Sequence, residues 1–222
     1  FAPSNEREDV GVKGEFAAAV FEANRKSVVT WYNPETRERP ETTLEAAVDW
    51  WAKYLGVAHH LSTRDAGHSG VSWTVQMLPQ AHARPLESVG IGVSQVLPIL
   101  VCGLLARQGA IILIEQPELH LHPRAQARLA DFFVSLQATG RQCIIETHSD
   151  CLVARFRLLL VSGQFSGEDV KIYFVRQDSS GAAQYDKISV SPSGAIANWP
   201  DGFFDESVIL EDKIAQEAIR AK

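Results

Sequence analysis

The sequence has few features of a membrane protein or of a disulfide-stabilised one. No apolar run approaches the roughly 18 residues that a membrane-spanning helix needs, and the opening stretch FAPSNEREDV lacks the basic-then-apolar pattern of a signal peptide. The 3 cysteines, Cys102, Cys143 and Cys151, form no CxxC pair, and their odd number argues against a disulfide framework. We therefore expect buried, reduced thiols, a cytoplasmic location and no membrane partner.

The sequence also lacks an excess of basic residues. It carries 21 Lys and Arg against 27 Asp and Glu, which gives a formal net charge of -6. A protein that neutralises many phosphates is usually basic, so nucleic-acid binding by this chain alone is disfavoured. The 222 residues are 45% hydrophobic, which is ordinary for a globular protein with one sizeable core or two small ones. The first residue is Phe1 rather than Met, and we expect a piece of a longer protein.

Two apolar segments predict the centre of the fold. Residues 110–115 (AIILIE) and 142–147 (QCIIET) are typical of buried strands, and a helical pattern follows each of them. The order strand, helix, strand, helix predicts a parallel α/β sheet flanked by helices. We expect Ile112, Ile114 and Ile144 to be buried on both faces of this sheet.

The segments before this sheet are predicted from their local patterns. Residues 25–41 are rich in charge and proline and predict a loop, whereas Thr42–Glu45 indicates a capping box before a helix that Gly56 ends. Residues 70–78 alternate between apolar and polar, which predicts a half-buried strand. Residues 92–107 predict a helix with one interior proline.

The composition changes after Gly163. Residues 171–175 and 186–190 predict two strands joined by a turn. Trp199 and the pair Phe203–Phe204 are expected to fill the core of this C-terminal part, and a charged helical tail follows them. The sequence therefore predicts a small α+β extension behind the parallel sheet.

Polar side chains crowd the end of the first central strand. The stretch IILIEQPELHLHP, residues 111–123, places Glu115, Gln116 and Glu118 directly after the apolar residues. Carboxylates at the end of a parallel strand are an arrangement that holds Mg²⁺ beside a phosphate group. The second strand ends in ETHSD, and its His148 should reach the same crevice.

Three motifs together resemble a known family. IILIEQPELHLHP looks like a Walker B strand that continues into a D-loop, IIETHSD looks like a switch-histidine strand, and VGIGVSQVLPIL at residues 89–100 stands where the signature motif belongs. Their order and spacing resemble the ATP-binding cassette ATPases, in particular the SMC/RecF/OLD-like group of prokaryotic AAA-type ATPases. The resemblance covers about residues 86–160. The segment around NWPDGFFDE resembles an uncharacterised domain that follows this ATPase type.

The resemblance implies roles at the two strand ends. Glu115 matches the Walker B acid, which holds Mg²⁺, and His148 matches the histidine that contacts the γ-phosphate. Gln116 stands where many members have the carboxylate that polarises the attacking water. An amide can orient water but cannot take its proton, so either Glu118 substitutes as the base or hydrolysis is slow.

The resemblance also implies a second set of nucleotide contacts, made across a dimer interface. Gly90 and Gly92 match the small residues of the signature, whose backbone N–H groups approach the γ-phosphate of a nucleotide held by the other subunit. Gly90 replaces the family's serine. Ser94 and Gln95 open the following helix, whose N-terminus favours an anion, and His122 occupies the D-loop position.

The sequence contains no G-x-x-x-x-G-K-[ST] motif, the loop whose backbone cradles phosphates. We expect this Walker A loop on an upstream segment, so that the chain is the C-terminal half of an ATPase head and is inactive alone. The expected division is residues 1–85 as a signature-side lobe, 86–163 as the ATPase segment and 164–222 as the extension. By resemblance the ligands are ATP and Mg²⁺, the partner is a second copy, and the setting is bacterial DNA repair or phage defence, with DNA or an effector protein as a further partner.

Two other functions remain open from the residues alone. A non-hydrolysing nucleotide sensor or scaffold is consistent with Gln116. A metal-dependent hydrolase could use a cluster of acid and imidazole ligands, which would comprise Glu118, His120, His122 and His148. Four arginines could contact DNA or phosphate, although solvated helix faces are the commoner place for such residues: Arg124, Arg128, Arg155 and Arg157.

Overall fold

The computed structural model divides into two compact units, Phe1–Phe156 and Arg157–Lys222. Trp199 and much of the charged tail, for which we predicted a core and a helical role, lie outside the residues that the structure describes. The described residues are 9–67, 70–191, 193–196, 198, 200, 202–204, 210, 212–214, 216–217 and 219.

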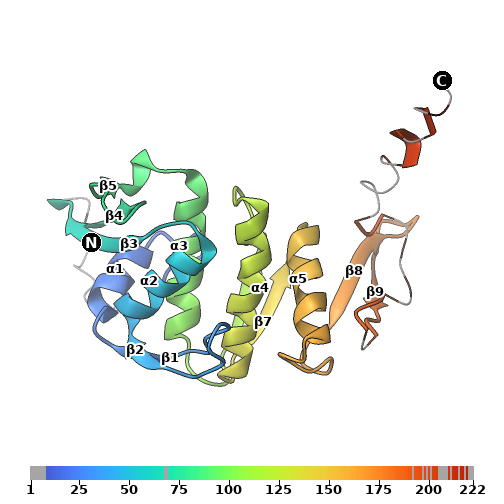
Figure 1. Ribbon diagram of the computed structural model, residues 1–222, viewed down its shortest axis with the longest axis horizontal. Helices are drawn as coiled ribbons and strands as arrows, with labels where there is room; N and C mark the ends of the chain where they lie inside the picture. Colours follow the sequence, from blue (N-terminus) through green and yellow to red (C-terminus); the bar gives the residue numbers. More distant parts are fainter. Residues whose placement is uncertain are drawn as a thin grey trace. The chain divides into compact units, whose positions relative to one another are not determined.

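The first unit begins with two helices and a short pair of strands (Figure 1). Helix α1 spans Ala17–Asn24, and strands β1 (Val28–Thr30) and β2 (Glu41–Thr43) pair antiparallel. The prediction of a loop throughout residues 25–41 is therefore wrong at β1 and at Glu41, where β2 begins. The apolar Val28–Val29 pair favours an extended strand once β2 is available to bond with it.

Helix α2, Leu44–Leu55, begins one residue later than its capping pattern predicted. The Thr43 side chain accepts a hydrogen bond from the Ala46 N–H at 3.2 Å, so Thr43 rather than Thr42 is the N-cap. Gly56 ends the helix with φ at 77°, a left-handed conformation that glycine adopts without steric cost. The predicted helix and its end are confirmed.

An antiparallel sheet comes next, made of β3 (His60–Asp65), β4 (Val71–Gln76) and β5 (Arg84–Pro85). The alternation in residues 70–78 predicted β4 correctly, and Trp73 and Val75 are buried as that pattern requires. Strand β3 was not predicted, because its residues are mostly polar and carry no comparable alternation.

The centre of the unit alternates helices and parallel strands. Helix α3 (Ile91–Leu105) precedes strand β6 (Ile111–Glu115), and helix α4 (Pro123–Ala138) leads to strand β7 (Gln142–Glu146). Helix α5 begins at Asp150 and ends at Val161. Strands β6 and β7 pair parallel, with Leu113 opposite Ile144. The predicted parallel α/β fold with flanking helices is confirmed.

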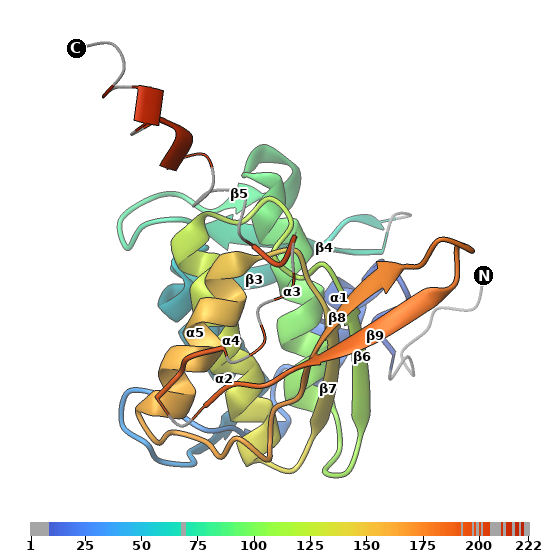
Figure 2. The same cartoon turned by 90° about the vertical axis from the view of Figure 1, so that its right-hand side faces the viewer.

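The structure corrects the prediction that this strand pair is buried on both faces. Ile112 is 8% exposed, but Leu113 is 75% exposed and Ile144 is 51% exposed. Helices α3 and α4 lie on one side of the pair (Figure 2), and no described residue buries the side chains of the opposite face. An apolar strand is buried only where another element of the structure covers it, and here one face is covered.

The core of the first unit lies where α2, α3 and α4 meet. Trp51 of α2 packs edge-on against Phe132 of α4, with ring centroids 5.0 Å apart. A side-chain carbon at Gly103 of α3 would lie 2.8 Å from Phe132, so the glycine permits the close approach of α3 and α4. The Arg141 guanidinium joins separate segments of this unit, because it donates hydrogen bonds to the carbonyl oxygens of Ala106 at 2.6 Å and Thr30 at 3.4 Å.

The second unit contains an antiparallel hairpin, β8 (Ile172–Gln177) and β9 (Ala183–Ile188). Asp178 organises its turn by accepting hydrogen bonds from Ser180, Gln184 and Ala182, and these bonds lower the pKa of its carboxyl to about 2. Phe203 is buried and lies 5.7 Å from Phe174, ring to ring, which agrees with its predicted place in the core.

The cysteines and the lengths of the helices give two further observations. The three cysteines are free, as expected, but they are partly rather than fully buried. Burial, with a smaller effect of Cys102, raises the pKa of the Cys143 thiol to about 12, so this thiol stays protonated at neutral pH. Among the described residues, no helix is long and apolar enough to cross a membrane.

Candidate active site

The parallel register of β6 and β7 brings two exposed carboxylates together. Glu115 lies directly opposite Glu146, at the carboxyl ends of both strands. Beyond the register, the Gln116 N–H donates to the Glu146 carbonyl oxygen at 2.9 Å. Gln116 has φ at 45°, so the chain turns sharply out of the strand at this residue. Two exposed carboxylates and the start of the following loop therefore meet at one edge of the strand pair.

Glu118 is buried and connects the two loops that come after the strands. It is 6% exposed, and its Oε1 accepts a hydrogen bond from the His148 backbone N–H at 2.6 Å. Its Oε2 is also buried and has no hydrogen-bond partner among the described residues. A charge-assisted bond of this length holds the His148 backbone firmly in place. Glu118 therefore links the two loops by a hydrogen bond and is not open to solvent.

A second connection joins the same loops through Gln126 of α4. Its Nε2 donates to the Leu121 carbonyl oxygen at 2.9 Å, and its Oε1 accepts from the Ser149 hydroxyl at 2.8 Å. The Ser149 oxygen accepts in turn from the Leu152 N–H at 3.1 Å, in the first turn of α5. Sequence reasoning missed Gln126, because its role depends on a contact with a residue 23 positions away in the chain.

The His148 side chain faces outward from this framework. Its imidazole is 78% exposed, and Nε2 lies 3.8 Å from Oε1 of Glu146, whose side chain is 57% exposed. The backbone of His148 is fixed by Glu118, while its ring is open to contact a ligand at the strand ends. This combination of a fixed backbone and an exposed ring suits a residue that contacts a bound phosphate.

The start of α3 lies against the loop after β6. A side-chain carbon on Gly92 would lie 2.6 Å from the His120 carbonyl oxygen, a contact that forces the backbone to move. Gly90, the N-cap of α3, has nothing within 4 Å at the same position. The two predicted signature glycines therefore differ: Gly92 is required by packing, and Gly90 faces open space.

The other predicted ligand contacts lie at helix starts. The Ser94 hydroxyl donates to the Ile91 carbonyl oxygen at 2.6 Å, and Gln95 is exposed. His122 is the N-cap of α4, where its Nδ1 accepts from the Arg124 N–H at 3.3 Å. His122 thus stabilises a helix start in this chain, whatever it contacts outside it.

Two parts of the sequence match known protein families. Residues 76–154 match the family described as an AAA domain, with a provisional assignment to the AbiEii toxin of a Type IV TA system. Residues 166–214 match a family described as a protein of unknown function, DUF3696. No curated protein matches the sequence closely enough to add a relative.

Solved structures of SMC head domains have a similar fold. A Smc head bound to the C-winged helix domain of ScpA is 12% identical, with a TM-score of 0.51, and the match covers 81% of this chain and 47% of that one. A Smc head with an extended coiled coil, bound to the C-terminal domain of ScpA from Pyrococcus furiosus, is 10% identical with a TM-score of 0.50, covering 91% and 41%. A third match, from work on ATP-driven dimerization and DNA-stimulated activation of SMC ATPases, is 15% identical with a TM-score of 0.49, covering 76% and 89%.

Residues 76–154 of the chain are similar to that AAA-domain family, and the chain has a fold like that of SMC heads. It spans less than half the length of two of these head domains, 47% and 41%. Within residues 76–154, β6 is the strand predicted as Walker B, the loop after it is the predicted D-loop, and β7 leads to the predicted switch histidine. The start of α3 is the predicted signature.

The residues at the ends of β6 and β7 fit Mg²⁺ as a cofactor better than they fit a transition metal. Glu115 is an exposed carboxylate, and Mg²⁺ is commonly held by one or two carboxylates together with phosphate oxygens and water. Within the described residues, no group of three or more His, Cys, Asp and Glu side chains could hold a metal ion alone. The acid and imidazole side chains named for the metal-hydrolase alternative form no such group among the described residues, and Glu118 and His122 each accept a hydrogen bond from a backbone N–H.

Proposed function

We propose that this ATPase segment binds and hydrolyses ATP between two copies of the protein arranged head to tail. In this arrangement Glu115, Gln116 and His148 of one copy face the same nucleotide as the α3 start of the other. A segment outside these 222 residues supplies the phosphate-binding loop. The observation that supports the proposal most strongly is the parallel pairing of β6 and β7, which aligns Glu115 with Glu146 and sets His148 beside them.

Each of these residues has a different role at the nucleotide. Glu115 holds Mg²⁺, which when bound neutralises charge on the phosphate oxygens. The exposed His148 imidazole donates to the γ-phosphate, and Glu118 positions that histidine through its backbone N–H. Glu118 is 6% exposed, so it is poorly placed to meet an attacking water. Gln116, which is partly exposed, is the residue that orients the water.

This division predicts slow hydrolysis, because an amide cannot accept the proton of the attacking water. A nucleotide sensor that hydrolyses rarely is the second candidate function, and Gln116 at this position favours it. Replacement of Gln116 by Glu distinguishes the two. A rise in the rate of phosphate release would show that the rest of the site is competent and that the missing base limits it.

Substitutions at Glu118 test its role directly. Glu118→Gln keeps an oxygen that accepts the His148 N–H, so we expect a loss of less than about tenfold in kcat, whereas loss of a general base costs about 10²–10⁴-fold. Glu118→Ala removes the acceptor and should lower kcat more than Glu118→Gln does. Steady-state phosphate release by the full-length protein, measured across pH, gives both values.

The kcat values of Glu118→Gln and Glu118→Ala distinguish a positioning role from a general base. A general base at Glu118 would show as a large loss in Glu118→Gln together with disappearance of the acidic limb of the pH–rate profile. That result would contradict a positioning role. Thr147→Ser is a matched control on the same loop, because it retains the hydroxyl that accepts the Ser149 N–H at 3.0 Å.

The biological setting belongs to the proposal as well. We propose a bacterial, cytoplasmic ATPase that acts in DNA repair or phage defence, with DNA or an effector protein as a further partner. We also propose the three-part division at residues 85 and 163, with the segment matched by DUF3696 as a separate extension. Pull-down of DNA and of proteins by the full-length ATPase, with and without ATP, tests which partner it engages.

A further inference from the structure

A pocket of about 400 Å³ lies in the first unit, lined by three elements and a loop. The lining residues are Pro34 and Glu35 from the loop between β1 and β2, Tyr54 from α2, Arg124, Ala127 and Arg128 from α4, and Arg155 from α5. Its volume lies in the range of small-ligand sites in proteins. Three guanidinium groups at one such pocket require a physical explanation.

Arg155 and Tyr54 form a rigid wall of this pocket. Arg155 makes a bidentate ion pair with Asp131, whose side chain is 0% exposed, through bonds of 2.8 Å from Nη2 and 3.1 Å from Nε. Burial, followed by the charge of Asp131, raises the pKa of Tyr54 to about 12, so its hydroxyl remains a proton donor at neutral pH. Arg155 thereby neutralises the buried carboxylate of Asp131.

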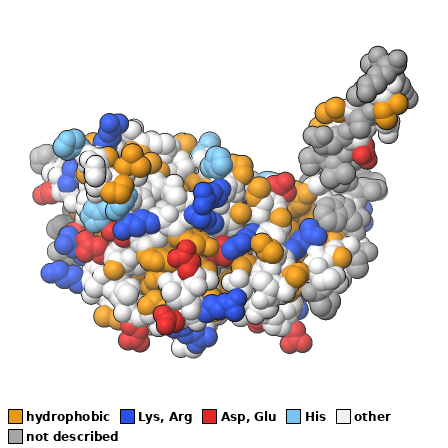
Figure 3. Space-filling model, viewed as in Figure 1, with side chains coloured by type: hydrophobic (Ala, Val, Ile, Leu, Met, Phe, Trp, Pro, Cys, Tyr) orange, Lys and Arg blue, Asp and Glu red, His pale blue; other side chains and the backbone are white. Residues whose placement is uncertain are grey.

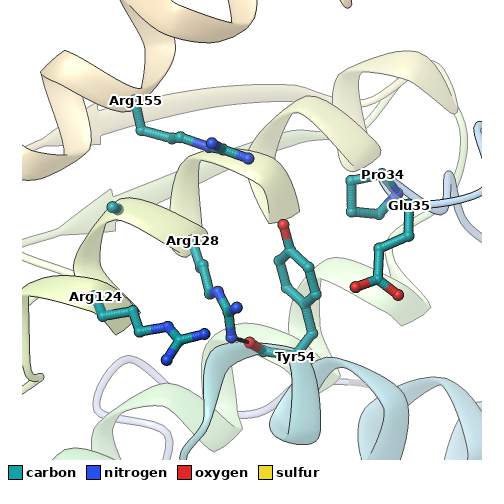
Figure 4. A pocket seen from close by; sticks show the side chains of 7 residues that line it. Pro34, Glu35, Tyr54, Arg124, Arg128 and Arg155 are labelled. Atoms are coloured by element: carbon teal, nitrogen blue, oxygen red, sulfur yellow. Dashed lines mark hydrogen bonds between the residues drawn. The ribbon is translucent and has the colours of Figure 1, made fainter.

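Arg128 is also held in place. Its Nη1 donates to the Tyr54 carbonyl oxygen near the end of α2, and its guanidinium lies 4.8 Å from the centre of the Tyr54 ring. Figure 4 shows Arg124 and Arg128 on one side of Tyr54 and the Glu35 carboxylate on the other. The cationic side of the pocket is therefore organised before any ligand arrives.

Contacts within the described part of the chain do not explain the position of the Arg124 side chain. Its guanidinium makes no hydrogen bond or ion pair with any residue in the described part of the chain, although its backbone N–H is bonded to His122. Arg124 stands in the first turn of α4, and this first turn contains no acidic residue. A cation in the first turn of a helix opposes the helix dipole and is unfavourable. An anion bound beside Arg124 would remove this repulsion.

We propose that this pocket binds the phosphate group of a small phosphorylated molecule, which Arg124 and Arg128 contact directly with Arg155 behind them. The guanidinium fork matches phosphate oxygens and binds them with two parallel hydrogen bonds. Ala127 leaves room between the two arginines of α4. The site is separate from the residues assigned to ATP above, and it does not depend on that assignment.

The charges favour a small phosphorylated ligand over a nucleic-acid backbone. Lys and Arg side chains gather over α4 on the face seen in Figure 3, but the chain as a whole carries a net charge of -6. A backbone-binding surface needs an extended basic stripe, whereas this pocket is bounded by Glu35 on its far side. The restricted positive charge suits one compact phosphate-bearing ligand.

Calorimetric titration of the full chain with inorganic pyrophosphate tests the proposal. We expect saturable binding that Arg124→Ala weakens by roughly 10- to 100-fold, as loss of a charge-assisted contact does. Arg124→Lys retains the charge but not the fork and should lie between Arg124→Ala and the unchanged protein. Arg84→Ala, which removes an exposed arginine outside the pocket, and His148→Ala, at the proposed ATP site, should bind like the unchanged protein.

Thermal unfolding with and without pyrophosphate separates binding from folding. Without ligand, Arg124→Ala should melt at the same temperature as the unchanged protein or slightly above it, and with pyrophosphate it should lose the ligand-induced rise. Three results would overturn the proposal: no saturable binding, equal effects of Arg124→Ala and Arg84→Ala, or binding of a short duplex DNA in the absence of pyrophosphate binding.

Discussion

Gly92 determines how closely the start of α3 approaches the loop after β6. An added side-chain carbon would lie 2.6 Å from the His120 carbonyl oxygen and 3.0 Å from the Leu121 side chain. The first of these neighbours is backbone, so it cannot move aside as a flexible side chain would. Gly92 therefore acts through packing inside one chain, in addition to any contact with a nucleotide.

Substitution of Gly92 by Ala should destabilise the fold. Overpacking costs about 1–3 kcal/mol, and the better helix propensity of Ala offsets up to about 1 kcal/mol of that. We expect a net loss of about 1–2 kcal/mol in the free energy of unfolding, measured by urea denaturation. Gly90→Ser is the matched control: that position is open and a helix N-cap favours serine, so stability should stay unchanged or rise slightly. Equal stability of the two variants would contradict the close contact.

At the level of single residues, the sequence predicted the positions that depend only on where the strands end. Glu115 and His148 stand where their apolar strands predicted, because parallel strands that pair in register end at the same edge. The burial of Glu118 could not be predicted, since it depends on a bond to the His148 backbone 30 residues away. Gln126 was missed for the same reason. Roles that depend on contacts between loops need the structure.

At the level of elements, the apolar runs predicted β6 and β7 but not their environment. Only the side chains that alternate with Leu113 along β6 face the helices, and an unbroken apolar sequence cannot show which face another element covers. Strand β3 was missed because its polar residues carry no clear alternation. Helices α2 and α3 were predicted closely, since their capping residues and glycines lie within the local sequence.

The two faces of β6 are buried unequally, so substitutions of the adjacent residues Ile112 and Leu113 should affect stability differently. Ile112 is 8% exposed, so Ile112→Ala should lower the free energy of unfolding by about 2–5 kcal/mol through loss of packing. Leu113 is 75% exposed, so Leu113→Ala should change it by less than about 0.5 kcal/mol. Denaturant midpoints of the two variants of this chain provide the comparison. Similar losses at both positions would show that the Leu113 face is also covered.

At the scale of the whole molecule, the first unit contains the positions predicted as Walker B, D-loop, switch and signature, from Gly90 to His148. The framework joining them consists of the Glu118 and Gln126 bridges and the contact at Gly92. The second unit has its own hairpin and a buried phenylalanine, and no predicted nucleotide contact lies in it. The proposed nucleotide chemistry therefore belongs to the first unit, and this proposal can be tested on the complete protein.

Steady-state ATP turnover by three variants of the full-length protein tests this central claim most directly. Glu115→Gln removes the carboxylate assigned to Mg²⁺, and His148→Ala removes the donor assigned to the γ-phosphate. Each should lower phosphate release by about 100-fold or more, as loss of such groups does. His82→Ala, which changes an exposed histidine outside the site, should leave the rate unchanged. Normal turnover in both Glu115→Gln and His148→Ala would contradict the assignment of this site to ATP.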